Sequence, residues 1–497
     1  MKRIAIIGGG IAGLSAAYEL ALQQHAGAPI EFVLFDAASR LGGIVETVRR
    51  DGFVIECGPD SWVTEKPWAR DLALELGLES ELVPSRDDRR KTYLVQGRAL
   101  TAMPDGMRMM VPAQWAGVLN SPLFSWQAKL AYLREPKLAE QLKTSAIDAA
   151  GSSRDESVRD FVFRHFGAEV ADTIAAPLLA GVFGGDIAML SARAVLPAFV
   201  ALERDYGSLV LGLQQRRQAG DEPAAIFTTL RHGLAGLVEG MESHIPASSI
   251  QSGIVVASID RTGEGWVVHR ASVPGVSHPA SQTFDAVLVA TPAKTTAQLF
   301  GAIDERIEEL LPQQSSSAIV VALAFSADRA SAMRIPRGFG FLVPQIAAQY
   351  GPSRPISNDD VEAIAQSALL ACTFVDQKFP QRAPKDAVLL RAFFGGPTVA
   401  PLLEVSDATL LRLAQTTLGR IVGKLPEPSI ALVRRWPDSL PLYSVGHLDR
   451  MAELDARISR LPHMRLIGNA YRGVGLPDLI HTGRTAAREL TASLTGA

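Results

Sequence analysis

A glycine-rich turn directly after an apolar strand, at the start of the chain, constrains the fold more than any other feature. Residues 4–7 are four consecutive apolar residues, and helix-forming residues follow the turn. The turn consists of Gly8, Gly9, Gly10, Ile11, Ala12 and Gly13. The spacing G-x-G-x-x-G gives a tight turn, room for a pyrophosphate against the backbone, and close packing of helix on strand. The sequence therefore predicts a dinucleotide site in a Rossmann-like α/β domain.

Two later features indicate which dinucleotide binds. A second apolar stretch, residues 30–35, ends at Asp36, about 20 residues after the last glycine, where a carboxylate can hold a ribose hydroxyl. Asp36 would repel a 2′-phosphate, which argues against NADP. Arg40, Gly42 and Gly43 form a second glycine turn, which is more typical of FAD than of NAD sites. The alternative is a glycine turn in an ordinary βαβ unit that binds no nucleotide.

Length, composition and charge limit the remaining classes of protein. The 497 residues suffice for two or three domains, and the net charge of −3 gives no reason to expect a nucleic acid partner. The nine histidines never recur at i, i+3 or i, i+4, so no compact metal site is expected. No signal segment precedes the first strand, and the longest uncharged apolar run, 318–325, is too short to span a bilayer. We expect a cytoplasmic protein, at most peripheral to the inner face of the cell membrane.

Three further segments are candidates for a ligand site. Gly58, Pro59, Asp60 and Ser61 follow a short strand, where Gly58 would admit a flat ring system; Asp60 and Ser61 fit equally well as the N-cap of the next helix. Residues 103–112 combine four methionines with Arg108, which suits an apolar wall with a carboxylate-binding arginine, although an exposed loop is the interpretation that sequence alone favours. Residues 466–484 form a strand, a glycine-rich loop and a helix, which predicts a second glycine site at the end of the chain.

These segments resemble the FAD-dependent porphyrinogen oxidases of haem synthesis, a family that includes protoporphyrinogen oxidase and bacterial coproporphyrinogen III oxidase. The resemblance runs nearly end to end. It is carried by residues 8–14, 39–43, 55–61, 181–186, 338–344, 440–447 and 468–484. The first two segments are shared with the wider amine-oxidase-like superfamily, and the last four are the more specific ones.

The resemblance implies a para-hydroxybenzoate-hydroxylase-like arrangement of three parts. The FAD-binding domain would comprise residues 1–86, 227–300 and 430–497. A substrate-binding domain with a mixed sheet would comprise residues 87–105, 191–226 and 301–429. Residues 106–190 would form a helical insert that covers the mouth of the pocket and, in some relatives, meets the membrane.

The family's site residues carry over by position. Residues 8–13 would hold the pyrophosphate, Asp36 the ribose and Val256, through its backbone, the adenine. The flavin would lie among Arg40, Gly42, Gly43, Gly58, Pro59, Asp60, Ser61, Val474, Gly475 and Leu476. Arg108 would pair with a substrate propionate, and Gly181, Phe339 and Leu342 would form pocket walls. Relatives often have glutamate in place of Asp36, so the shorter side chain would bind one ribose hydroxyl instead of two.

The implied activity is the six-electron oxidation of a porphyrinogen to the porphyrin, with O2 as acceptor and H2O2 as product. No general base, other catalytic residue or metal ligand is assigned. The sequence does not separate coproporphyrinogen III from protoporphyrinogen IX, although interior stretches favour the former. The resemblance also implies transfer of the product to a ferrochelatase and peripheral membrane contact. The alternatives are a flavin amine oxidase, a carotenoid desaturase and a non-catalytic FAD-fold binding protein.

Overall fold

The nucleotide-binding part of the molecule is built on a parallel sheet of five strands. A computed structural model describes residues 1–147, 153–218, 225–263, 265–271, 281–301, 303–344 and 358–496. The strands follow the order β12 (Ile250–Ser252), β2 (Ile30–Asp36), β1 (Lys2–Ile7), β16 (Ala286–Val289) and β22 (Met464–Leu466). Every neighbouring pair is parallel. The predicted strands 4–7 and 30–35 are therefore confirmed as neighbours in one sheet.

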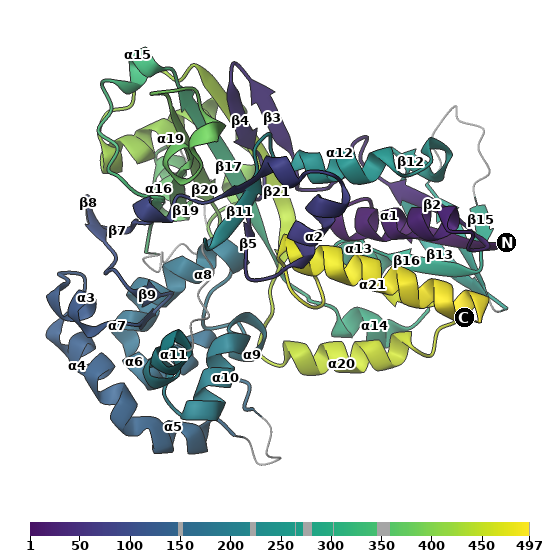
Figure 1. Cartoon of the computed structure of the whole chain (residues 1–497), viewed down its shortest axis with the longest axis horizontal. Helices are drawn as coiled ribbons and strands as arrows, with labels where there is room; N and C mark the ends of the chain where they lie inside the picture. The colour runs from purple at the N-terminus through teal and green to yellow at the C-terminus, as the bar shows by residue number, and fades with distance from the viewer. Residues whose placement is uncertain are drawn as a thin grey trace.

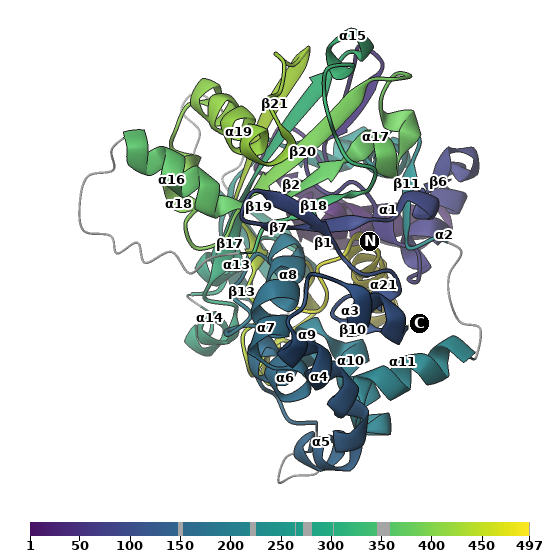
Figure 2. The same cartoon turned by 90° about the vertical axis from the view of Figure 1, so that its left-hand side faces the viewer.

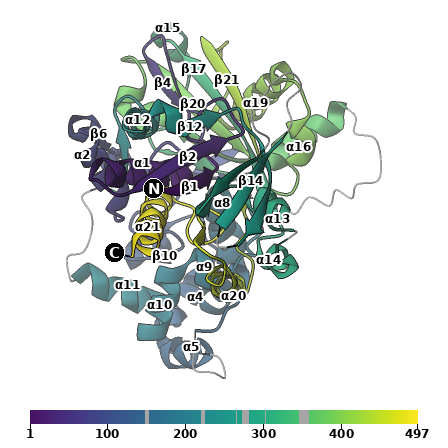
Figure 3. The ribbon, with the colours of Figure 1, turned by 90° about the vertical axis from the view of Figure 1, so that its right-hand side faces the viewer.

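Both faces of this sheet are covered, which explains why its strands are apolar without alternation. Ile4 and Ile6 face one side, where they pack against α1 (Ile11–His25), α12 (Ala235–Ser243) and α21 (Leu476–Thr495). Ala5 and Ile7 face the other side. There they meet the antiparallel strands β13 (Val256–Thr262), β14 (Gly265–Arg270) and β15 (Ser281–Phe284), and the helices α13 (Ala293–Phe300), α14 (Glu305–Leu310) and α20 (His447–Ile458). Figure 3 shows the sheet between these two layers.

A second, mixed sheet of seven strands lies beside the first part (Figure 1). Its order is β21 (Ile430–Pro441), β17 (Ser315–Phe325), β20 (Val388–Phe394), β19 (Leu369–Phe374), β18 (Gly340–Leu342), β7 (Thr92–Gln96) and β8 (Ala99–Ala102). Only the β18–β7 pair is parallel. Helices α16 (Asn358–Ala368), α18 (Ala400–Leu403) and α19 (Asp407–Val422) pack on one face. The predicted α/β class with a mixed second sheet is confirmed.

A helical unit with its own apolar core lies below the seven-stranded sheet in Figure 2. Its helices are α3 (Trp115–Asn120), α4 (Trp126–Arg134), α5 (Ala139–Ser145), α6 (Val158–Phe166), α7 (Ala168–Val170), α8 (Ala176–Phe183), α9 (Ala192–Val195), α10 (Pro197–Tyr206) and α11 (Leu209–Gln218). A π-helical turn, Ala171–Ala175, joins α7 to α8. Gly184, in the left-handed conformation at φ 67°, ends α8. Among the helices of the described residues, none is both long and apolar enough to cross a bilayer.

Short strands connect these parts. β3 (Thr47–Arg50) pairs with β4 (Phe53–Glu56), and β11 (Phe227–Leu230) lies between β5 (Trp62–Val63) and β6 (Leu82–Pro84). Helix α2 (Trp68–Glu75) follows β5, and the hairpin of β9 (Met107–Arg108) and β10 (Val111–Pro112) leads into the helical unit.

Two predicted domain limits differ from this arrangement. Residues 430–441 pair with β17, so they lie in the seven-stranded sheet, although the prediction assigned them to the FAD-binding domain. Residues of α9, α10 and α11 belong to the apolar core of the helical unit, although residues 191–226 were expected in the substrate-binding domain. In both cases long-range packing sets a limit that local composition does not mark. The rest of the predicted division stays a prediction.

Candidate flavin site

At Gly8 and Gly13 of the first glycine turn the neighbouring backbone excludes a side chain, whereas the space beside Gly10 is open. Gly8 has φ 105°, and a Cβ at Gly13 would lie 1.9 Å from the carbonyl oxygen of Gly8. Gly10 is the N-cap of α1 without a side-chain cap. Apart from the two neighbours of Gly10 in the chain, no described residue lies within 4 Å of the position that a Cβ on Gly10 would occupy. The open space therefore faces Gly10 at the positive end of a helix, which suits a pyrophosphate.

Asp36 stands at the end of β2 beside this turn. Its Oδ2 accepts a hydrogen bond from the Gly9 N–H at 2.5 Å, and its Oδ1 accepts one from Ala38 N–H at 2.6 Å. Ile254 N–H donates to the Asp36 carbonyl at 2.8 Å, which brings the start of β13, and thus Val256, to the same edge of the sheet. The positions of Asp36 and Val256 suit the predicted roles at the ribose and the adenine, which stay predictions.

The second glycine turn lies directly against the first. Gly42 N–H donates to the Gly9 carbonyl at 2.8 Å, and a Cβ at Gly43 would lie 3.2 Å from Cα of Gly10. The Arg40 guanidinium donates to the carbonyl oxygens of Leu41, Gly43 and Val45 at 2.5–3.0 Å. The Arg40 side chain therefore stabilises the turn by binding the carbonyl oxygens of the residues that form it.

The third segment, Gly58–Ser61, lies next to the second glycine turn. A Cβ at Gly58 would lie 1.9 Å from the carbonyl oxygen of Ile44, so only glycine fits. The interpretation of Asp60 and Ser61 as a helix N-cap is wrong, because strand β5 follows and α2 begins at Trp68 with Pro67 as its N-cap. Asp60 instead pairs with Lys378 at 3.0 Å and with Arg391 at 3.2 Å.

The last segment returns to the first glycine turn from the other end of the chain. Gly475 is the N-cap of α21, and Asp478 in its first turn pairs with Lys66 at 2.7 Å. A Cβ at Gly483 would lie 2.2 Å from the carbonyl oxygen of Ala12 in α1. Because α1 and α21 pack together on the sheet (Figure 1), segments 8–13 and 474–476 lie on one side of the fold.

The residues predicted to contact the substrate come from the β9–β10 hairpin, from α8 and from β18 with the residue before it. Arg108 is half-exposed, and its Nη2 lies 3.5 Å from Glu65, next to the Lys66 that pairs with α21. Leu342 and Val474 both pack against the core of the helical unit. Gly181 on α8 is exposed, and the space beside it is open. Phe339 is buried directly before strand β18 of the mixed sheet, where its N–H donates to the Lys91 carbonyl.

The interpretation of residues 103–112 as an exposed loop is wrong. Met110 is fully buried, and Met103, Met107 and Met109 pack against the core of the helical unit. Met109 and Met110 form the two-residue turn of the β9–β10 hairpin, with Met109 at φ 54°. Arg108 therefore projects from an ordered apolar wall, which suits binding of an apolar ligand with a carboxylate.

Several side chains at this site were missed by sequence reasoning. Arg391, Lys378 and Arg382 contact the segment 56–61 from the mixed sheet and its connections. Trp436 of β21 donates from Nε1 to the carbonyl oxygen of Cys57 at 2.8 Å. The one signal in the sequence was Arg391 itself, a charged residue inside the apolar stretch 388–394.

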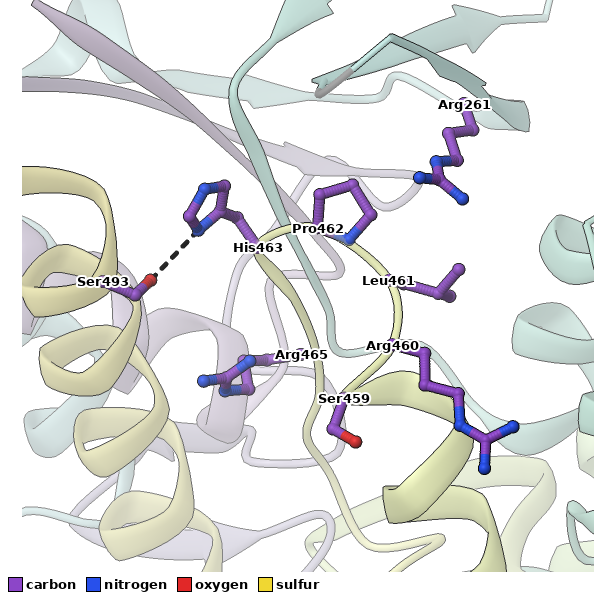
Figure 4. Close-up of a pocket in the computed structure, with 8 residues that line it drawn as sticks. All are labelled: Arg261, Ser459, Arg460, Leu461, Pro462, His463, Arg465 and Ser493. Atoms are coloured by element: carbon purple, nitrogen blue, oxygen red, sulfur yellow. Dashed lines mark hydrogen bonds between the residues drawn. The ribbon is translucent and has the colours of Figure 1, made fainter.

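A separate hollow lies away from these segments, where the loop before β22 meets the end of α21 (Figure 4). It measures about 510 Å³ and is lined by Arg261, Ser459, Arg460, Leu461, Pro462, His463, Arg465 and Ser493. His463 and Arg465 point toward α21, whereas Arg261 and Arg460 lie on the other side of the loop. None of the residues predicted to bind FAD lines this hollow, so it is not the predicted flavin site.

A Rossmann-like sheet, an open cradle at Gly10 and two helix N-termini on one side define the class as a dinucleotide-binding protein. The chain belongs to the flavin containing amine oxidoreductases, whose family profile matches residues 11–491. FAD is therefore its cofactor, and the open cradle fits the pyrophosphate of that group. The chain is an oxidoreductase, as the family resemblance implied.

Several known proteins are similar to this chain over nearly its full length. Coproporphyrinogen III oxidase of Bacillus subtilis is 31% identical over 98% of this chain and 97% of its own. The protein of the same name from Staphylococcus aureus is 28% identical over 99% and 100%. A crystal structure from Exiguobacterium, provisionally named protoporphyrinogen oxidase, is 30% identical, with a TM-score of 0.80 over 99% and 98% of the two chains. Putrescine oxidase, at 16% identity and a TM-score of 0.65, shares the fold.

Proposed function

We propose that this protein oxidises a porphyrinogen, in particular coproporphyrinogen III, to the corresponding porphyrin with O2 as acceptor. The observation that carries the proposal is the position of Arg108 on a wall lined by methionines. Arg108 contacts Glu65, and the adjacent Lys66 pairs with Asp478 in the first turn of α21. The substrate is a flexible apolar disc with carboxylates at its rim, and an arginine at the edge of an apolar wall matches that distribution. The names of the full-length relatives support the same activity.

The residues of this chain would bind and orient the two reactants. The N–H groups at the start of α1 would hold the pyrophosphate, and the start of α21 would face the flavin. Arg108 would fix one carboxylate of the substrate, while Leu342 and Val474 would exclude water from the face of the macrocycle. FAD supplies the two-electron chemistry, so a six-electron oxidation takes three cycles. No side chain is assigned as a proton acceptor.

The decisive experiment compares the two porphyrinogens side by side. The purified protein is mixed with each substrate without oxygen, and porphyrin fluorescence is followed after oxygen is admitted, together with H2O2. We expect fluorescence and H2O2 from both, with the higher kcat/KM for coproporphyrinogen III. A FAD-loaded protein that oxidises neither substrate, or that oxidises a primary amine instead, contradicts the proposal. A colourless protein that cannot be loaded with FAD would favour a binding protein without redox activity.

The same proposal includes contact of the helical unit with a membrane surface. Trp126, Leu130 and Leu133 follow one another at i, i+4 and i+7 on one face of α4 and are 74%, 46% and 39% exposed. Phe163 on the neighbouring α6 is 57% exposed. An exposed apolar face of this kind can enter a lipid interface.

This part of the proposal has its own test. Replacing Trp126, Leu130 and Leu133 by serine should abolish co-sedimentation with anionic vesicles and leave the thermal midpoint nearly unchanged. Replacing the exposed Val255 and Val445, on other parts of the molecule, is the control. Transfer of the porphyrin to a ferrochelatase belongs to the same proposal. When a ferrochelatase is added, direct transfer would make the porphyrin fluorescence fall faster than the porphyrin dissociates from this protein into solution.

A further inference from the structure

Five ionisable side chains form a buried network directly behind the segment Gly58–Ser61. Lys378 Nζ lies 3.0 Å from Oδ1 of Asp60, and Arg391 Nη1 lies 3.2 Å from Oδ2 of the same carboxylate. Arg382 Nη2 lies 2.8 Å from Oε1 of Glu56. None of these five side chains is more than 13% exposed. The contacts thus join three cations to two carboxylates, so the network carries at least one positive charge in excess. Burial raises the pKa of Glu56, and protonation of that carboxylate would add to the excess.

The same cations also hold the backbone of the segment. Arg391 donates to the carbonyl oxygen of Gly58, and Lys378 donates to Oγ of Ser61 at 3.0 Å. Arg382 donates to Oγ1 of Thr229 at 2.6 Å, and that hydroxyl donates to the Asp60 carbonyl at 2.7 Å. Since all three cations come from residues 378–391, the part of the chain that carries the mixed sheet fixes a segment of the nucleotide-binding part.

The excess charge is not neutralised by any contact that the described residues make. Nε and Nη1 of Arg382 and Nε of Arg391 are buried, and within the described part of the chain they have no hydrogen-bond partner. Burial alone would raise the pKa of Asp60, but the charges of Lys378 and Arg391 outweigh it and lower that pKa, so Asp60 is ionised. A buried surplus cation in a low-dielectric region favours a negative charge close by.

We propose that Lys378, Arg382 and Arg391 are positioning residues that raise the reduction potential of the bound flavin by favouring its anionic reduced form. The inference rests on the proposed function in one respect, namely that the isoalloxazine lies against Gly58–Ser61. Two electrons and one proton convert oxidised flavin to an anion whose negative charge lies on the ring. The surplus positive charge behind Gly58–Ser61 stabilises that anion and leaves the neutral oxidised ring almost unaffected.

Two variants of the buried Lys378 and one variant of the exposed Lys294 test this inference. Lys378→Met removes one cation, and the apolar end of methionine can occupy the place of Nζ over the rings of Phe227 and Phe379, whose centroids lie 4.3 and 5.1 Å from Nζ. Lys378→Arg keeps the charge. Lys294→Met is the matched control, because the Lys294 side chain is 76% exposed. The midpoint potential of each FAD-loaded protein is measured without oxygen against reference dyes, and no porphyrinogen is present.

We expect Lys378→Met to lower the equilibrium constant of the two-electron reduction about tenfold, which is about 30 mV. Lys378→Arg and Lys294→Met should stay within about threefold of the parent, or about 15 mV. A FAD-loaded Lys378→Met protein with the parent's potential overturns the inference. If that variant does not fold, the parent enzyme decides: its reduced flavin should keep the spectrum of the anion at mildly acidic pH, and protonation at the pH of free reduced FAD overturns the inference.

The outcomes separate this inference from the proposed function. A protein that oxidises porphyrinogens but shows no shift of potential in Lys378→Met retains the proposed function and loses the inference. A protein that shows the shift but oxidises neither porphyrinogen retains the inference and loses the proposed substrate.

Discussion

Gly483 of α21 packs so closely on Ala12 of α1 that a Cβ at Gly483 would lie 2.2 Å from the Ala12 carbonyl oxygen. The contact is reinforced by Glu19 of α1, whose carboxylate accepts hydrogen bonds at 2.7 Å from Nε of both Arg484 and Arg488. These contacts fix the middle of α21 against α1, and thereby the direction in which both helices run. The two glycine-rich ends of the chain can therefore face one cofactor.

Gly483→Ala should disturb this helix pair, because the backbones must move apart to admit a methyl group. We expect a loss of about 1–3 kcal/mol in the free energy of unfolding and weaker FAD binding. Gly419→Ala is the control, since no described residue outside the neighbouring backbone of α19 lies within 4 Å of that Cβ position, and it should stabilise by about 0.5 kcal/mol. Urea unfolding and FAD titration measure both effects. An equally stable Gly483→Ala protein would show that α21 is not packed as described.

Gly10→Val should abolish FAD binding and leave the fold of the apoprotein intact. The Cβ position at Gly10 is open, and its φ of −63° is allowed for any residue, so the side chain would enter only the space of the pyrophosphate. Gly13→Val is the comparison: its Cβ would lie 1.9 Å from the Gly8 carbonyl, so it should lower the thermal midpoint itself. Absorbance of bound flavin and calorimetry distinguish the two. A Gly10→Val protein that stays fully yellow contradicts the assigned role of Gly10.

Arg108→Ala should raise KM for the porphyrinogen about tenfold and change kcat by less than about threefold. The guanidinium would bind a carboxylate equally in the ground and transition states, and the lost charge-assisted hydrogen bond is worth about 1.5 kcal/mol. Arg159→Ala, another half-exposed arginine of the helical unit, is the control. Steady-state kinetics with both porphyrinogens gives the result, and an unchanged KM counts against the role of Arg108.

His165 should make the stability of the helical unit depend on pH. Its fully buried imidazole lies between Glu135 at 2.9 Å and Glu203 at 3.1 Å. Burial alone would lower the pKa of His165, but the hydrogen bonds and charges of the two carboxylates outweigh it and raise that pKa. The stabilisation is therefore fully present below the unfolded pKa of about 6.5 and is lost as pH rises through the folded pKa.

The variant His165→Gln tests this pH dependence. We expect the parent to lose about 2 kcal/mol more than His165→Gln does when denaturation is compared between mildly acidic and alkaline pH. His244→Gln, at an exposed position, should follow the parent. Identical pH profiles for the parent and His165→Gln would show that His165 is uncharged in the folded protein.

A site residue was predictable where its role depends on residues that are near it in the sequence. Gly13 and Gly58 were identified correctly as positions for glycine, because a Cβ there would meet the carbonyl oxygens of Gly8 and Ile44, which lie close by in the sequence. Gly8 was identified from the tight turn, where its φ is 105°, although the carbonyl oxygen that a Cβ there would meet belongs to the distant Ala290. Asp60 was equally open to a capping role, because Lys378 and Arg391, its partners in the structure, lie more than 300 positions away in the sequence. The burial of Met110 likewise depends on a core that the following helices supply.

By itself, the sequence determined the strand–glycine–helix unit at each end of the chain, the FAD-type second glycine turn and the α/β class. These features follow from backbone sterics and from apolar patterns over a few residues. Only the tertiary structure decided that β21 joins the mixed sheet, that α1 and α21 touch at Gly483, and that a surplus positive charge is buried behind Gly58–Ser61. Those relationships depend on contacts between distant segments, which no local pattern of residues encodes.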